Sequence, residues 1–217
     1  LGIDTATGLS PVVLALDLPL QNSIYLSRKG GFYNNPDPVI EGNLQDAEAL
    51  EYYTNIGMFS SPDPLTRKDT LSGWLNANGF PTGDVSAIYF NNLDLQFGRQ
   101  MHCRELTGGG LACYVTNFGS PGGPVQPALN DAISDVNEVA TVTMEFDPTI
   151  AEGQPNRIKF YVYDATGAYI TRAALDSQGP KPVPHICLVC HGGIYDATDN
   201  DVIGGAFREF DVFGFEF

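Results

Sequence analysis

Three residues near the end of the chain have the types and spacing needed to hold a haem covalently. They occur in the run Cys187-Leu188-Val189-Cys190-His191, which matches the Cys-x-x-Cys-His pattern of c-type haem attachment. In that chemistry the two thiols add to the two vinyl groups of the haem, and the adjacent histidine binds the iron. We therefore expect one covalent haem c, attached through Cys187 and Cys190, with His191 as the proximal ligand.

Two other interpretations of the Cys-x-x-Cys pair stay open. A thioredoxin-like redox pair has the same spacing, but it needs a helix that starts at the first cysteine. Gly192-Gly193 follow the motif at once and disfavour that helix. A zinc site would need two further ligands, which Cys103 and Cys113 would have to supply at an unusual spacing.

The other two cysteines flank a glycine-rich turn. The segment Gln100–Asn117 is predicted to form a hairpin centred on Gly108, and Cys103 and Cys113 each lie five positions from that centre. Directly opposed residues of an antiparallel pair have Cα atoms roughly 4.5–5.5 Å apart, which suits a disulfide. We expect a Cys103–Cys113 disulfide, with two buried thiols as the alternative.

A second axial ligand must come from upstream or from another chain, because no His or Met follows His191. His102 is the first candidate, since strand alternation points it away from the disulfide that would stiffen its strand. Met101, on the other face, is an alternative, and so is His185 from a neighbouring chain. A histidine hydrogen-bonded to a neighbour is the competing interpretation of His102, and Met144 fits the apolar face of a strand.

The elements that must position these groups are mostly strands. From Val85 onward apolar and polar residues alternate, which is typical of half-buried strands, and the clearest runs are Ala140–Phe146 and Ile158–Tyr163. Two short helices are expected earlier, over Asn43–Ile56 and Asp69–Asn78. Further strands are expected over Val12–Leu18, Ser23–Leu26 and Ala168–Ala173, and loops after Ser177.

These patterns predict a mainly β fold with two short helices near the N-terminus. We expect one domain over residues 1–217, β-sandwich-like or irregular, with haem c near its C-terminus and a small helical lobe over residues 40–80 as a variant. An ordinary cytochrome c has its haem motif near the start of the chain. The late motif therefore argues against the all-α cytochrome c fold.

Composition and charge limit which classes of partner the protein can bind and which cellular compartment it can occupy. The 217 residues carry a formal net charge of −15, so nucleic acid and anionic membranes are poor partners. No apolar run reaches the roughly 18 residues of a membrane span. The start at Leu1 suggests a removed signal peptide, and the apolar end at Phe217 suggests further residues. Because haem c and a disulfide both need an oxidising compartment, we expect a periplasmic, cell-surface or extracellular protein.

An acidic cluster follows the haem motif. It comprises Asp196, Asp199, Asn200 and Asp201. Oxygen ligands of this kind suit Ca²⁺, although their spacing does not match an EF-hand. A solvated acidic loop is the competing interpretation.

The sequence also has a resemblance to known proteins. Its Cys187–His191 motif resembles that of monohaem c-type cytochromes in the broad sense. Three segments together are similar to a group of secreted bacterial haem-c proteins of unassigned function: Thr70-Leu71 with Trp74 and Asn78-Gly79-Phe80, then Gly98–Cys103, then Cys187–Gly193. Only the haem motif is specific. The resemblance implies haem, secretion and a bacterial source, and it supplies no activity.

Three functions fit these observations. The first is electron transfer by one haem held by His191 and His102, with a redox partner protein of basic surface. The second is a peroxidase-like enzyme or a gas-binding protein with an open sixth position, where His102 with Arg104 or Arg99 would assist. The third is a structural subunit of a multi-haem array that self-associates through His185. We expect an electron carrier rather than an enzyme.

Overall fold

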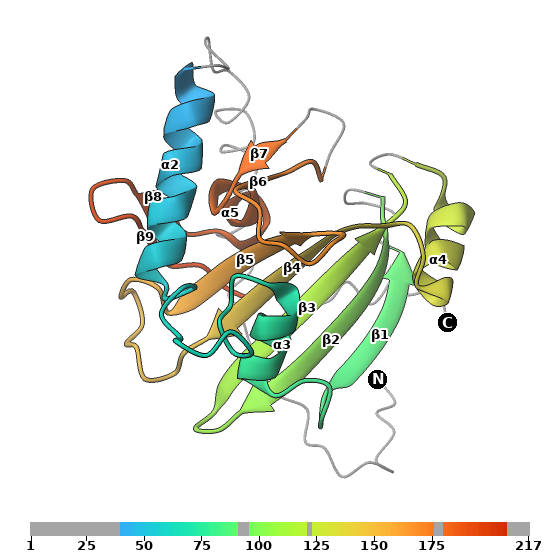
Figure 1. Ribbon diagram of the computed structural model, residues 1–217, viewed down its shortest axis with the longest axis horizontal. Helices are drawn as coiled ribbons and strands as arrows, with labels where there is room; N and C mark the ends of the chain where they lie inside the picture. The colour runs from blue at the N-terminus through green and yellow to red at the C-terminus, as the bar shows by residue number, and fades with distance from the viewer. Residues whose placement is uncertain (1–39, 91–95, 121–122, 176–179, 208–217) are drawn as a thin grey trace.

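Five antiparallel strands form the largest sheet of the protein. In the computed structural model, which describes residues 40–90, 96–120, 123–175 and 180–207, they lie side by side in chain order (Figure 1). The strands are β1 Val85–Phe90, β2 Gly98–Leu106, β3 Gly110–Phe118, β4 Glu138–Phe146 and β5 Ile158–Asp164. The predicted mainly β fold class is confirmed. Among the described residues, two short ribbons and several helices accompany this sheet in place of a second large sheet.

Helices and ribbons surround the sheet. The ribbons are β6 Arg172–Ala173 with β7 Lys181–Pro182, and β8 Ile194–Asp196 with β9 Asp201–Ile203. The helices are α2 Ile40–Asn55, α3 Leu71–Asn78, α4 Val125–Ser134 and α5 His185–His191. Helices α2 and α3 lie where the sequence predicts helices. The Thr70 hydroxyl accepts a hydrogen bond from the Gly73 amide, and Gly79 ends α3 at φ 75°, so local capping determines both of its ends.

Three parts of the chain differ from the prediction. After Ser177 the sequence predicts loops, but the structure has β7, α5, β8 and β9 there, elements too short to show a hydrophobic period. The sequence does not predict helix α4, because Pro127 interrupts the helical pattern of apolar residues. In the structure Pro127 lies in the first turn of the helix, where proline is tolerated. Within Ala168–Ala173 only β6 is a strand, preceded by isolated bridges at Ala168 and Tyr169. The strands expected over Val12–Leu18 and Ser23–Leu26 lie outside the described residues.

The sheet has two faces with different neighbours. Directly paired residues of antiparallel strands point to the same side, and neighbours along one strand point to opposite sides. The helix face, as we call it, carries the cross-strand row His102, Tyr114, Thr143 and Tyr161. Helix α3 packs on this face, with the Trp74 ring 6.3 Å from that of Tyr114 and 6.5 Å from that of Tyr161. The opposite face carries the row Cys103, Cys113, Met144 and Phe160.

The C-terminal part of helix α2 contacts the outer edge of β5. The hydroxyl oxygens of Tyr52 and Tyr53 accept hydrogen bonds from the amides of Phe160 (2.9 Å) and Val162 (3.2 Å). Both tyrosines are fully buried, and Figure 1 shows the C-terminal end of α2 next to β5, with the rest of the helix extending away from the strand. An exposed sheet edge can pair with other chains, so this contact both satisfies the β5 amides and protects the edge.

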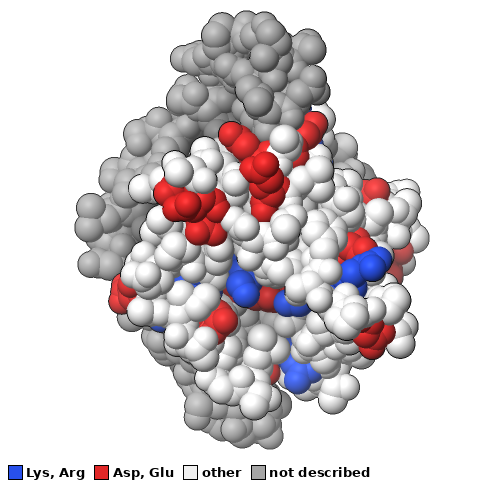
Figure 2. All heavy atoms as spheres, turned by 60° about the vertical axis from the view of Figure 1, so that its left-hand side comes forward, with Lys and Arg blue, Asp and Glu red and all other residues white. Residues whose placement is uncertain are grey.

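The described surface is mixed in charge. Figure 2 shows Asp and Glu side chains in several separate groups on the face that carries α2, with Lys and Arg side chains among them. Scattered acidic groups of this kind form a solvated surface. Within the described ranges, no helix has the length and apolar character required to cross a bilayer.

Candidate haem-attachment site

Helix α5 contains the whole Cys-x-x-Cys-His motif. At 3.6 residues per turn, Cys187, Cys190 and His191 lie on one side of the helix, because they are three and four positions apart. The helix ends at His191 because Gly192 turns the chain to φ 69° and ψ −166°, a conformation that favours glycine. A helical turn thus holds two thiols and one imidazole close together.

The ring of His191 is held in one orientation. Its Nδ1 lies 3.0 Å from the carbonyl oxygen of Ala206, and because a carbonyl only accepts, Nδ1 must donate. In the neutral ring the proton is then on Nδ1, and Nε2 carries the lone pair. Metal-binding histidines commonly have their second nitrogen held in this way. The amide of Ala206 also donates to the carbonyl of His191 at 3.0 Å, so the two residues are joined twice.

Close glycine packing makes that contact possible. Gly193 adopts φ 90°, and a Cβ there would lie 2.8 Å from both the Gly205 nitrogen and the Ile203 oxygen. Only glycine fits such an approach of two backbones. Ribbon β8–β9 closes the intervening loop and returns the chain to Ala206. A larger residue at position 193 would therefore separate helix α5 from the segment that orients His191.

The two motif cysteines have different environments. Cys187 is buried and Cys190 is half-buried, and neither forms a disulfide. Burial, with a smaller effect of the Cys190 charge, raises the pKa of the Cys187 thiol well above its usual range. Redox-active Cys-x-x-Cys pairs instead need a lowered thiol pKa. The environment of Cys187 therefore disfavours the thioredoxin-like interpretation, and any reaction of this thiol with a haem would have to precede its burial.

Cys103 and Cys113 form a disulfide between β2 and β3. They are direct cross-strand partners with Cα atoms 4.1 Å apart, as the hairpin centred on Gly108 predicts. Zinc binding needs cysteine thiolates, and the disulfide leaves neither sulfur available. The interpretation in which these two residues complete a zinc site with α5 therefore loses its ligands.

His102 has partners of its own on the helix face. Its Nδ1 lies 2.6 Å from Oδ2 of Asp84, and its ring stacks on that of Tyr114 with a centroid distance of 4.6 Å. The His191 ring instead lies 5.4 Å from that of Phe160, which belongs to the opposite face. Strands β2 and β5 are also three places apart in the sheet, roughly 14 Å at the usual strand spacing. The structure does not bring His102 and His191 together.

The two alternative ligands and Met144 are placed differently. Met144 is a buried core residue, as its strand pattern predicts, and it is the direct cross-strand partner of Phe160 on the opposite face. Met101 shares that face but lies on β2. His185 begins α5, and its ring meets Tyr195 edge-on at 4.8 Å. Of the two alternative ligands, only His185 lies on the helix that carries the motif, and Met144 is joined to it through its strand partner Phe160.

The two arginines considered for peroxide chemistry both lie on β2. Arg104 is on the helix face, where its guanidinium donates to the carbonyl of Gly79. Arg99 points to the opposite face and donates to Oδ1 of Asn117 at 3.1 Å. Neither strand position is adjacent to β5, where His191 packs.

The acidic loop joins ribbon β8–β9 to other elements. Asp196 accepts a hydrogen bond from the Thr198 amide at 2.9 Å, and the Asn200 side-chain amide donates to Glu51 of α2 at 2.7 Å. Asp201 accepts a hydrogen bond from the side chain of Asn156. In the part of the chain that the structure describes, no three His, Cys, Asp or Glu side chains gather as a metal site would require.

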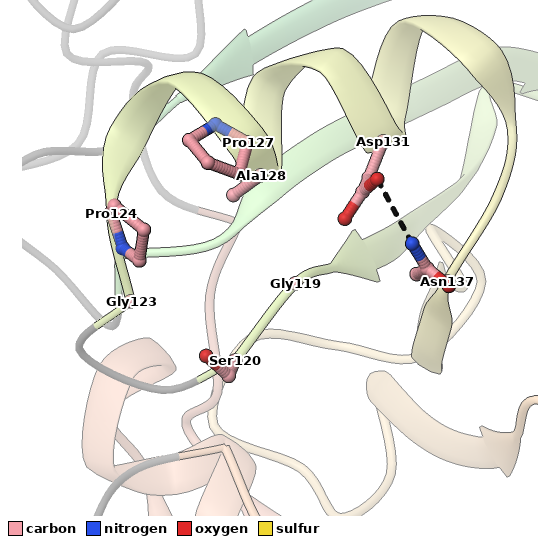
Figure 3. Close-up of a pocket in the computed structure, with 8 residues that line it drawn as sticks. All are labelled: Gly119, Ser120, Gly123, Pro124, Pro127, Ala128, Asp131 and Asn137. Atoms are coloured by element: carbon pink, nitrogen blue, oxygen red, sulfur yellow. Dashed lines mark hydrogen bonds between the residues drawn. The ribbon is translucent and has the colours of Figure 1, made fainter.

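Two shallow pockets lie away from α5. One, of about 270 Å³, lies beside α4, and Figure 3 shows the carboxylate of Asp131 facing Asn137, which donates to it at 3.0 Å. The other, of about 420 Å³, lies beside α3 and includes Glu138, whose pKa is raised by burial. The residues that line them include no His or Cys, and neither pocket offers a set of catalytic groups.

Several partners could not be recognised in the sequence. Asp84 is two residues before Ser86, the cross-strand partner of His102, so only the β1–β2 register reveals it. Ala206 contributes a backbone carbonyl and has no side-chain signal at all. The pairing of Lys68 with Glu145 joins residues 77 positions apart.

Comparison with known proteins does not identify this site. No family model, no curated protein and no solved structure matches the chain. The functional argument therefore depends on the chemistry of the motif and on the contacts described above.

Proposed function

We propose that the protein is an extracytoplasmic monohaem c-type cytochrome that transfers electrons. One haem would be attached through Cys187 and Cys190, with Nε2 of His191 on the iron. The observation that supports this best is the His191–Ala206 hydrogen bond, which assigns the proton of the neutral ring to Nδ1 and the lone pair to Nε2, in the same helix as the two cysteines. When bound, the haem supplies a one-electron Fe(III)/Fe(II) couple.

The surroundings of α5 agree with such a site. The ring of Phe160, beside His191, and the side chain of Leu188, within the motif, are both buried. An apolar shell of this kind limits the access of water to a metal centre. The Cys103–Cys113 disulfide is consistent with an oxidising compartment. The net charge of −15 favours a basic redox partner whose encounter rate falls as salt rises.

The test is expression with export and c-type haem maturation. We expect a coloured protein whose Soret band survives acid–acetone extraction, and a peptide containing Cys187 and Cys190 that carries the mass of one haem. A colourless chain, or a haem that extracts into the acetone, would contradict the proposal.

A second candidate is a haem enzyme or gas-binding protein with an open sixth position. The position of His102 favours it, because this histidine is engaged by Asp84 on the face away from Phe160. Spectra of the ferric protein distinguish the cases. A high-spin iron that binds CO quickly after reduction supports the open site, and a low-spin iron with a methionine charge-transfer band supports a ligand such as Met144.

A further inference from the structure

We propose that Tyr161 is a redox-active tyrosine, with Glu145 as the acceptor of its proton and with Trp74 and Tyr114 as its route to the surface. The inference concerns the helix face of the sheet and not helix α5. It does not depend on the proposed haem.

The hydroxyl of Tyr161 has a carboxylate as its partner. It lies 3.2 Å from Oε2 of Glu145, and both side chains are buried. Glu145 also accepts from the Lys68 ammonium at 2.6 and 2.8 Å and from the Asn78 amide at 2.8 Å. Both of these groups can only donate, and each of the two carboxyl oxygens of Glu145 accepts from at least one of them. The phenol therefore faces a carboxyl oxygen that two other donor groups hold in place through three hydrogen bonds.

Burial decides how Tyr161 can be oxidised. It raises the phenol pKa well above its usual range, and the charge of Glu145 adds to this effect, so the phenol does not lose its proton first. Removal of an electron makes a phenol strongly acidic. The electron then goes to a one-electron acceptor outside the protein, the Tyr161 O–H bond breaks, and a new O–H bond forms on Oε2 of Glu145. Glu145 becomes neutral while Lys68 keeps its charge, so the net charge of the cluster rises by one. Solvent can reach that cation, because the Lys68 side chain is 24% exposed.

Aromatic rings connect Tyr161 to the surface. The ring of Trp74 lies 6.5 Å from that of Tyr161 and 6.3 Å from that of Tyr114. Tyr114 is half-buried and therefore accessible to an acceptor. Trp74 is fully buried, and its indole nitrogen has no hydrogen-bond partner within the described residues. In the described part of the chain no base contacts the indole nitrogen of Trp74, whereas the phenol of Tyr161 has one, so the oxidation is expected to move on to Tyr161.

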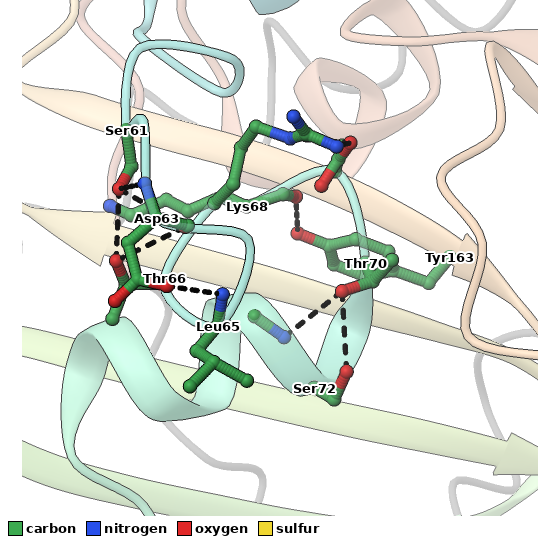
Figure 4. A network of polar contacts seen from close by, with 11 residues as sticks. Ser61, Asp63, Leu65, Thr66, Lys68, Thr70, Ser72 and Tyr163 are labelled. Carbon is green, nitrogen blue, oxygen red and sulfur yellow. Dashed lines mark hydrogen bonds and ion pairs between the residues drawn. The ribbon is translucent and has the colours of Figure 1, made fainter.

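Tyr163 provides a matched comparison. It lies two residues further along β5, points to the same face and is also fully buried. Its hydroxyl donates at 2.7 Å to the backbone carbonyl of Lys68 (Figure 4). A carbonyl is a far weaker base than a carboxylate. Tyr163 therefore shares the position and burial of Tyr161 but lacks its proton acceptor.

The experiment oxidises the full chain with photogenerated tris(bipyridine)ruthenium(III) and records the radical by EPR after rapid freezing. If a haem is attached, it is kept ferric. We expect a neutral tyrosyl signal in the wild type, loss of most of that signal in Tyr161→Phe, and its retention in Tyr163→Phe. A full signal in Tyr161→Phe would overturn the proposal.

Glu145→Gln tests the proton acceptor with the Tyr161 ring left in place. We expect slower formation and a lower yield of the radical, and loss of the slowing that the wild type shows in deuterated water. An unchanged rate and yield in this variant would also overturn the proposal. Because the EPR readout is independent of haem attachment, its failure and the failure of the cytochrome proposal are separate results.

Discussion

His102 and His191 lie on opposite faces of the five-stranded sheet. His102 stacks on Tyr114 of the helix face, whereas His191 packs against Phe160 of the opposite face. A single haem bound by His191 could not be reached by His102 of the same chain across the sheet in this arrangement. The structure thus favours other groups, or an open position, at the sixth site of the proposed haem.

Replacing Cys187 and Cys190 together with alanine is expected to abolish covalent haem attachment. The reason is that the two thioether bonds need the two thiols. The measurement is the Soret absorbance that survives acid–acetone extraction. The matched control is the Cys103→Ala, Cys113→Ala variant, which removes two cysteines elsewhere and should retain the haem.

Loss of the Cys103–Cys113 disulfide is expected to lower the free energy of unfolding by about 2–3 kcal/mol. The loop that it closes is short, so the entropy that it removes from the unfolded chain is limited. Urea unfolding of the double alanine variant measures the loss, and peptide mapping under non-reducing conditions locates the bond. Two alkylated thiols in the native protein would show that the disulfide is absent.

His102→Ala is expected to leave the spin state of the proposed haem unchanged and to lower stability by about 1–2 kcal/mol, because the Asp84 carboxylate loses its partner. EPR and urea unfolding measure the two effects. Asp84→Ala should lower the free energy of unfolding by a similar amount. The double variant should lose little more stability than either single variant, because both changes remove the same interaction. A change from low to high spin in His102→Ala would instead identify it as an iron ligand, contributed by another copy of the chain.

Lys68→Met is expected to destabilise the protein by about 2–3 kcal/mol. It leaves the Glu145 charge buried without its cation, and the loss is below the roughly 3–5 kcal/mol of a fully buried pair because Lys68 is 24% exposed. Adding Glu145→Gln to this variant should recover part of the stability by removing the charge. Chemical denaturation of the two single variants and the double variant checks this, and equal stability of Lys68→Met and the wild type would contradict it.

Asp164 is expected to make folding stability depend on pH in the acid range. Hydrogen bonds from the side chain and amide of Thr166 lower the pKa of its carboxyl below the ordinary 3.8. The carboxylate therefore contributes stability above the ordinary pKa, and this contribution is lost as pH falls through the lower, folded value. Asp164→Asn keeps an acceptor oxygen but cannot titrate. Its stability should change less between pH 5 and 2 than that of the wild type, and parallel profiles would refute the assignment.

Short-range features were predictable from the sequence alone. The register of the Cys103–Cys113 hairpin follows from its central glycines, and the end of α3 follows from Gly79. The predicted start at Asp69 is two residues early, because Thr70 caps the helix. In each case the deciding groups are close in the chain, so local geometry leaves few alternatives. The Cys-x-x-Cys-His motif is also local, and helix α5 contains all of it, whereas haem attachment through it stays a prediction.

Other features depend on segments that meet only after folding. Strand alternation placed His102 on one side of its strand, but the side taken by His191 depends on how α5 packs on β5. The Ala206 carbonyl and the Glu145–Tyr161 pair likewise become neighbours through the β8–β9 ribbon and the β4–β5 register. Because such contacts are set by the packing of distant elements and not by the residues beside them, only the tertiary structure determines which groups surround each candidate site.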